Sequence, residues 1–213
     1  MAGIEQLSPL EIDGHTPSQP QGADHPMRIM TRRAAGLVDP PWDADARLEV
    51  ADLFDSLASE WHTRTSDVRM KVVLDALDRG DVGGHTALEL GSGIGAYSAP
   101  LAERFDRVVA LDLSIEMLRL AVAEPGLRVL GDSARLPLPD DSVDTVVLIN
   151  MLLFPDEVDR VLRPEGTVVW VNSSGESTPI HLMADEVATA LPGRWGGVTS
   201  RAGIGLWTVL RRE

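Results

Sequence analysis

Apolar residues recur along this chain at spacings typical of alternating strands and helices. Short apolar runs predict strands at 86–90, 107–112, 127–130, 143–149 and 167–172, and a closing strand at 205–210 with a short strand near 195–200 before it. Apolar residues at helical spacing predict helices at 96–105, at 114–123, near 156–163 and at 180–190. This alternation is typical of an α/β fold, with a doubly wound, mostly parallel sheet and helices on both of its faces.

Two further helices are predicted ahead of this alternation. Apolar residues recur every three or four positions across 44–61, which favours a first helix. A second helix fits 66–78, with Ser66 as its N-cap and Gly80 as its stop signal.

Residues 1–41 differ in composition from the rest of the chain. They contain six prolines, scattered glycines and little periodicity, so we expect a flexible or extended segment, with a lid that orders over a ligand as the alternative. The sequence thus predicts three parts. Residues 1–41 form this segment, 42–82 form helices that cover a ligand site, and 83–213 form the α/β domain.

Charge and composition narrow the classes of function. The chain of 213 residues has 19 Lys and Arg against 33 Asp and Glu, a formal net charge of −14, which disfavours a nucleic-acid partner. It has no cysteine, which excludes disulfides, thiolate zinc sites and cysteine nucleophiles, and we expect no metal site. Without a long apolar run we expect no membrane segment and a cytoplasmic protein. Monomer and homodimer both stay open.

A glycine-rich turn follows the first strand of the alternation. The stretch Gly91-Ser92-Gly93-Ile94-Gly95-Ala96 lies where a strand leads into a helix, and a helix N-terminus offers free N–H groups to a ligand. The pattern fits G-x-G-x-G and also the looser dinucleotide fingerprint G-x-G-x-x-A. A nucleotide-like ligand is the default interpretation, and an NAD-dependent oxidoreductase and a turn without a ligand stay open.

A carboxylate ends the second strand, about 20 residues after the turn. Asp112 can accept hydrogen bonds from both hydroxyls of a ribose. The alternative is that Asp112 caps the helix that begins near Ile115, although Ser114 fills that role equally well.

A third polar group follows the third strand. Asp132 can accept from an exocyclic adenine amine, and the N–H of Ser133 can donate to a ring nitrogen. A dinucleotide-binding fold does not call for this stretch. Gly91, Asp112, Asp132 and Asn150 all fall at or just after strand ends, so we expect them to line one edge of the sheet.

With these four ordered motifs, residues 50–175 resemble the class I S-adenosylmethionine-dependent methyltransferases, in particular the group that includes the ubiquinone-biosynthesis C-methyltransferases. The resemblance implies a Rossmann-like seven-stranded sheet whose last strand is antiparallel, S-adenosylmethionine as cofactor with S-adenosylhomocysteine as product, and a small-molecule methyl acceptor. The cofactor-binding residues it implies are Glu89, Gly91, Ser92, Gly93 and Gly95 near the methionine end, Asp112 on the ribose, Leu113, Asp132 and Ser133 at the adenine, and Asn150 at the end of the fourth strand.

Two departures from the family pattern concern the acceptor side. Pro164-Glu165-Gly166 stands where the family usually has Pro-Gly-Gly. Only about 13 residues separate Asn150 from Arg163, which shortens a helix that in the family helps to wall the acceptor pocket. This second departure supports an alternative, a regulatory or non-catalytic S-adenosylmethionine-binding protein with a lost or reduced acceptor pocket.

Candidate catalytic residues are few. Methyl transfer needs a general base only when the acceptor must lose a proton. The candidates are Asn150 at a strand end, His62 after the first helix and His181 near the start of the helix after the fifth strand. An exposed position for His62 and an ordinary helix-start role for His181 are the alternatives. Residues 151–154 are apolar and line an acceptor pocket or belong to the core. Neither the acceptor nor the accepting atom (oxygen, nitrogen or carbon) follows from the sequence.

Overall fold

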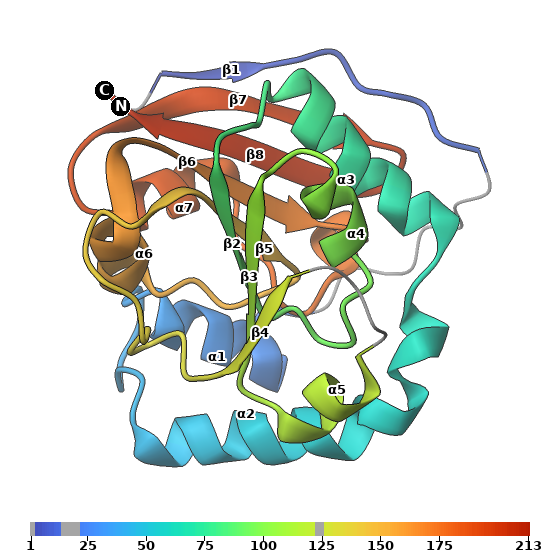
Figure 1. Cartoon of the computed structure of the whole chain (residues 1–213), viewed down its shortest axis with the longest axis vertical. Coiled ribbons are helices and arrows are strands. Elements are labelled where there is room, and N and C mark those ends of the chain that lie inside the picture. The colour runs from blue at the N-terminus through green and yellow to red at the C-terminus, as the bar shows by residue number, and fades with distance from the viewer. Residues whose placement is uncertain (1–2, 14–21, 122–125) are drawn as a thin grey trace.

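The described residues form one mixed sheet with helices packed against it (Figure 1). The computed structural model describes residues 3–13, 22–121 and 126–213. Its strand order is β1-β7-β8-β6-β5-β2-β3-β4. The strands are β1 (Ile4–Gln6), β2 (Thr86–Leu90), β3 (Arg107–Asp112), β4 (Leu127–Leu130), β5 (Val143–Ile149), β6 (Leu162–Asn172), β7 (Trp195–Ala202) and β8 (Gly205–Arg212).

The predicted α/β class is confirmed, with one strand more than expected. All neighbouring strands run parallel except β8, which is antiparallel to both β6 and β7. The last strand is therefore antiparallel, as the resemblance implies. The eighth strand is β1, which pairs in parallel with β7 at the edge of the sheet, Ile4 opposite Gly197. The expectation of seven strands missed it because it comes from the proline-rich N-terminal segment.

The helices follow the predicted order, although several are shorter than predicted. They are α1 (Pro26–Ala34), α2 (Ala44–Leu57), the 3-10 helix η1 (Ala58–Arg64), α3 (Asp67–Arg79), α4 (Ser98–Ala102), α5 (Ile115–Leu120), α6 (Pro155–Val161), the 3-10 turn η2 (Gly175–Ser177) and α7 (Ala184–Ala190). The predicted caps of α3 are present, because Ser66 Oγ accepts from the N–H of Arg69 and Gly80 ends the helix. Positions 122–123 of the helix predicted at 114–123 lie outside the described residues.

The N-terminal segment differs from the flexible or extended chain predicted for residues 1–41. In its described part, residues 26–34 form helix α1, and three residues of this helix are buried, Met30, Thr31 and Ala34. Pro26 occupies the first turn of the helix, where proline is tolerated because no N–H is needed there. The prolines thus start a helix here rather than prevent one. The division of the chain at 41/42 and 82/83 stays a prediction.

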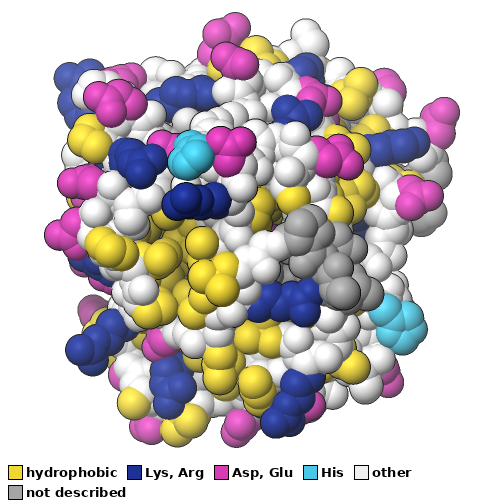
Figure 2. All heavy atoms as spheres, in the orientation of Figure 1, with side chains coloured by type: hydrophobic (Ala, Val, Ile, Leu, Met, Phe, Trp, Pro, Cys, Tyr) yellow, Lys and Arg dark blue, Asp and Glu magenta, His cyan; other side chains and the backbone are white. Residues whose placement is uncertain are grey.

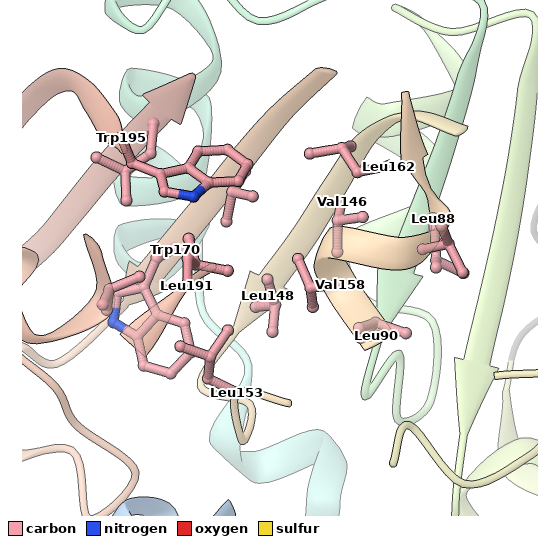
Figure 3. Close-up of a cluster of buried hydrophobic side chains, with 14 of the residues drawn as sticks. Leu88, Leu90, Val146, Leu148, Leu153, Val158, Leu162, Trp170, Leu191 and Trp195 are labelled. Carbon is pink, nitrogen blue, oxygen red and sulfur yellow. The ribbon is translucent and has the colours of Figure 1, made fainter. Parts of the chain in front are cut away.

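Alternate residues of the central strands face two apolar layers, one on each side of the sheet. Leu88, Leu90 and Val146 belong to one buried cluster, which α6 and α7 cover and which Figure 3 shows in close-up. Their sequence neighbours Ala87 and Val147 belong to the cluster on the opposite face, beneath α3 and α4. Since both faces are buried, the central strands are apolar runs rather than alternating ones, as expected for parallel strands covered by helices.

The segment between β5 and β6 is short, as predicted. Helix α6 spans seven residues and β6 begins directly after it, at Leu162, five residues earlier than predicted. The predicted turn at Pro164-Glu165-Gly166 lies inside β6, where the register with β5 shifts between Val143 and Thr145. The turn is therefore an irregularity of a long strand rather than a separate loop.

The surface carries mixed charge. On the face drawn in Figure 2, Lys and Arg side chains are scattered among Asp and Glu side chains rather than gathered in one patch. Within the described ranges, no helix has the length and apolar character required to cross a membrane.

Candidate functional site

A pocket of about 430 Å³ lies at the carboxyl ends of the parallel strands. Five strands each contribute a residue from their carboxyl end to the pocket wall. Asp112 is the last residue of β3, and the other four follow their strands: Gly91 after β2, Asp132 after β4, Asn150 after β5 and Ser173 after β6. The expectation that four of these residues share one edge is confirmed. This edge is where ligands bind in doubly wound sheets.

The glycine turn at the end of β2 brings backbone, rather than side chains, to the pocket. Gly91 has a φ of +67° and Gly93 a φ of +55°, a region that other residues rarely adopt. A Cβ at Gly91 would collide with Met151 Sδ, and one at Gly93 would lie 3.3 Å from Trp61 Nε1. Both positions therefore need glycine for the backbone conformation and for space.

Asp112 connects the glycine turn to β3. One carboxylate oxygen accepts from the N–H of Gly93 at 2.7 Å, and the other accepts from the N–H of Ser114 at 2.8 Å. Ser114 Oγ in turn accepts from the N–H of Met117, so Ser114 is the N-cap of α5 and the capping alternative for Asp112 is wrong. Burial raises the pKa of Asp112, which these backbone donors partly offset. Each oxygen keeps a lone pair for a further donor.

Glu89 lies beneath the turn, outside the pocket wall. Its side chain is 2% exposed and accepts a hydrogen bond from Ser98 Oγ at 2.6 Å. The pKa of Glu89 is raised to about 7, mainly by burial and also by the nearby charge of Asp112, although the hydrogen bond from Ser98 lowers it. The third glycine of the turn, Gly95, also lies outside the residues that line the pocket.

The remaining cofactor-binding candidates are in the pocket wall. Ser92, Leu113 and Ser133 line it, beside Asp132. The Oδ1 atom of Asp132 accepts from the N–H of Ala134 at 2.8 Å, which holds the carboxylate at the start of the loop. The structure thus brings together eight of the ten predicted cofactor residues in the pocket wall, all except Glu89 and Gly95.

Helix α2 and the 3-10 helix η1 cover one side of the pocket. Phe54 and Trp61 meet edge to face with ring centroids 5.5 Å apart, and both line the pocket. The guanidinium of Arg64 lies over the Trp61 ring, 5.2 Å from its centroid. These aromatic contacts fix Trp61 above the glycine turn.

A polar network links the ends of β5 and β6. Asn150 donates to Ser173 Oγ at 2.9 Å and accepts from the N–H of Ser173 at 2.9 Å, with a φ of +50°. Tyr97 and Ser173 both line the pocket beside this network. Burial raises the pKa of Tyr97, although Arg69 and Ser173 lower it. Both functional groups of the Asn150 amide are engaged, so the geometry gives Asn150 a positioning role rather than that of a base.

The sequence analysis missed Tyr97 and Ser173, which both line the pocket. Ser173 directly follows the predicted strand 167–172, the same signal that identified Asp112 and Asn150. Tyr97 lies two residues after Gly95 and is the only tyrosine in the sequence.

Neither predicted catalytic histidine is in the pocket wall. His62 is exposed on η1. His181 is buried, and its Nδ1 lies 2.9 Å from Asn172 Oδ1, which also accepts from Trp170 Nε1. Burial lowers the pKa of His181, and the charge of Arg28 lowers it further. His181 therefore belongs to a buried hydrogen-bond network behind the pocket.

A different histidine lines the pocket. His25 precedes α1, and its Nδ1 accepts from the N–H of Met27 at 3.1 Å, which makes it the N-cap of that helix. No local signal marked His25, because it lies in the segment expected to be flexible or extended. Among the described residues, no group of three or more His, Asp or Glu side chains is arranged to hold a metal ion.

Comparison with known proteins agrees with this site. Residues 88–170 match a family model described as a methyltransferase domain. Demethylmenaquinone methyltransferase of Paenarthrobacter aurescens is 29% identical over 68% of this chain and 63% of its own length. The chain thus spans less than two thirds of that relative.

Solved structures show the same fold. A structure titled as the complex of DhpI with SAH has a TM-score of 0.62 at 22% identity, over 76% of this chain and 94% of that one. A methyltransferase from Aquifex aeolicus, described as SAM-dependent, has a TM-score of 0.57 at 20% identity, over 72% and 97%. These two likenesses show that the chain shares its fold with a methyltransferase described as SAM-dependent and with a protein solved with SAH. Residues 88–170 of this chain are similar to the methyltransferase domain of such proteins.

Proposed function

We propose that the protein binds S-adenosylmethionine in the strand-end pocket and transfers its methyl group to a small-molecule acceptor. The observation that carries this proposal is the convergence of the glycine turn, Asp112, Asp132 and Ser133 on one pocket wall. They come from three strand ends, the glycine turn from β2, Asp112 from β3 and the Asp132-Ser133 pair from β4, and each strand end suits a different part of an adenosyl ligand.

The residues present suit this cofactor. The turn at Gly91 and Gly93 brings backbone without Cβ atoms to the pocket wall, where a ligand can contact it. Asp112 holds its carboxylate with two backbone donors and retains acceptor capacity for a pair of ribose hydroxyls. Leu113 offers an apolar surface to the adenine ring, and Asp132 can accept from its amine.

The chain's own residues have two tasks in such a reaction, to align the acceptor and to exclude water. When bound, S-adenosylmethionine supplies an activated methyl group, and its transfer leaves S-adenosylhomocysteine. Phe54, Trp61 and Met151 form apolar parts of the wall that limit access of water. Tyr97 offers a polar group, its hydroxyl, at the same wall.

The pocket also extends beyond the cofactor candidates. Its wall includes residues of α1, Trp42 and the loop after β6, such as Met27 and Ile180. This space supports an acceptor site and disfavours the alternative of a binding protein without one. The strand-end acid Asp132, which a dinucleotide does not require, likewise favours a methyltransferase over an NAD-dependent oxidoreductase.

Calorimetric titration with S-adenosylhomocysteine tests the proposal. We expect Asp112→Ala to weaken binding by at least about tenfold, since it removes charge-assisted hydrogen bonds of about 1.5–3 kcal/mol. Asp106→Ala is the matched control, because Asp106 lies at the opposite end of the same strand with its side chain 74% exposed. No measurable binding of S-adenosylhomocysteine or S-adenosylmethionine to the unmodified chain would overturn the proposal.

A further inference from the structure

We propose that the part of the pocket formed by α1, Trp42 and the loop after β6 is the acceptor subsite. We infer that it takes an apolar, ring-bearing molecule whose accepting oxygen is neutral or anionic, and that it excludes cationic amines. This inference rests on the proposed methyl transfer and names the class of acceptor.

The distribution of charge carries the first step. The carboxylates among the residues that line the pocket are Asp112 and Asp132, both at the ends of β3 and β4, where the adenosyl group is proposed to bind. The positively charged side chains in the same wall are Arg64 and Arg69. Acidic residues outnumber basic ones 33 to 19 in the whole chain, so the wall does not share the general excess of negative charge.

The polar groups of the proposed subsite are donors rather than carboxylates. Ser174, Ser177 and Thr178, from the loop after β6, contribute hydroxyl groups to the wall. The Ser177 hydroxyl donates to the Ser174 carbonyl oxygen at 2.6 Å, so the hydroxyls of Ser174 and Thr178 are the donors that an acceptor can use. A protonated amine needs an acidic partner to be bound away from water and a base to become a nucleophile. An oxygen of a phenol or carboxylate can instead accept hydrogen bonds from these hydroxyls and attract the basic side chains.

The apolar wall of the subsite suits a flat ring. Trp42 and Phe154 meet edge to face, with ring centroids 5.0 Å apart. Phe154 belongs to a buried cluster that also includes Leu152 and Ile180, and Trp42 and Met27 pack against this cluster. Aromatic side chains held in this way present large, ordered surfaces against which another ring can pack.

His25 supplies a hydrogen-bond donor, its Nε2–H, to this wall. Its Nδ1 is occupied by the N–H of Met27, so the neutral ring carries its proton on Nε2. Nε2–H is then a donor, and the ring cannot remove a proton from an acceptor while the cap is kept. His25 therefore acts in recognition of an oxygen rather than as a general base.

The transfer balances with these groups. A lone pair of the acceptor oxygen forms the new bond to the methyl carbon, and the carbon–sulfur bond breaks with its electron pair retained by sulfur. A hydroxyl acceptor releases its proton to water, and a carboxylate has none to release. No oxidant or reductant takes part.

Three naphthalene probes of similar size test the inference by binding alone. The full chain, saturated with S-adenosylhomocysteine, is titrated calorimetrically with 2-naphthol, 2-naphthoate and 2-(aminomethyl)naphthalene near neutral pH. We expect the naphthol and the naphthoate to bind at least about tenfold more tightly than the ammonium probe, a difference of about 1.4 kcal/mol. Equal or tighter binding of the ammonium probe, or no binding of any of the three, would overturn the inference.

A conservative variant tests the role of His25. Asn is among the best N-cap residues, so His25→Asn keeps the cap of α1 and removes the Nε2 donor. We expect it to weaken naphthoate binding by at least about threefold, with S-adenosylhomocysteine binding unchanged. His85→Asn is the control, since its half-exposed side chain lies before β2, at the opposite edge of the sheet. Unchanged naphthoate binding in His25→Asn contradicts this role, whereas failure of S-adenosylhomocysteine to bind the unmodified chain contradicts the proposed function itself.

Discussion

Replacing Glu89 by glutamine is expected to stabilise the protein in a manner that depends on pH. The carboxyl group is 2% exposed, and burial raises its pKa from 4.5 to about 7. Because the folded state holds this proton more tightly than the unfolded chain, the folded state binds more protons between these two pKa values. Stability conferred by the protonated group is therefore fully present below pH 4.5 and is lost as the pH rises toward 7.

The expected size follows from the two pKa values. A difference of about 2.5 pKa units corresponds to about 3.4 kcal/mol when the whole titration is crossed. Between about pH 5.5 and about pH 8 the loss is about 2 kcal/mol. Glu89→Gln removes this titration at nearly the same volume, and the amide oxygen can still accept from Ser98 Oγ.

Urea denaturation of both proteins at about pH 5.5 and about pH 8 measures this effect. The titrations of other groups are common to both proteins, so the difference in unfolding free energy isolates Glu89. It is expected to shift by about 2 kcal/mol in favour of the variant at the higher pH. A difference that stays constant within about 0.5 kcal/mol refutes the link between burial of this carboxyl group and folding. If Glu89 supports the proposed cofactor, the same variant binds S-adenosylhomocysteine more weakly. The substitution would then increase stability at the expense of binding, as is common at functional sites.

Two further pairs of variants separate local effects from general ones. Gly91→Ala and Gly36→Ala both place alanine at a similar positive φ, +67° and +69°, but only the former meets another side chain. We expect Gly36→Ala to cost about 1–2 kcal/mol of unfolding free energy and Gly91→Ala clearly more, and equal costs would contradict the steric argument. Asp75→Ala leaves the buried N–H of Trp207 without its acceptor at 2.7 Å and is expected to cost about 3–5 kcal/mol. Asp78→Ala on the same helix, 62% exposed, is expected to cost under about 1 kcal/mol, so similar melting curves for the two variants would refute the distinction.

The part of the site that was predictable is the part encoded locally. Asp112, Asp132 and Asn150 are each the first polar residues after an apolar run, and parallel strands bring their carboxyl ends to one edge. Their positions in the pocket therefore follow from the fold class alone. Ser173 was missed because the first polar residue after its apolar run is Asn172, and Ser173 lies one position further on.

The part that was not predictable depends on contacts between distant segments. Strand β1 has three residues, of which Glu5 and Gln6 are exposed, and it exists because it pairs with β7 almost 200 residues away. Helix α1 has its apolar residues at only a few positions, and they become buried only when α2 and the segment after β5 are in place. Neither element has a periodic pattern long enough to outweigh its neighbouring prolines.

The shortened segment after β5 and the N-terminal segment together complete the pocket wall. A seven-residue α6 leaves less structure to wall the pocket than the family pattern provides, which supported the alternative of a lost acceptor site. In the structure the missing wall comes from the N-terminal side, because Trp42 packs on Phe154 and Met27 joins the same cluster. Acceptor selectivity should therefore depend on residues 25–42 rather than on α6. Replacing residues 25–42 by a different sequence, with the strand-end residues kept, is expected to change which acceptors bind while cofactor binding is preserved.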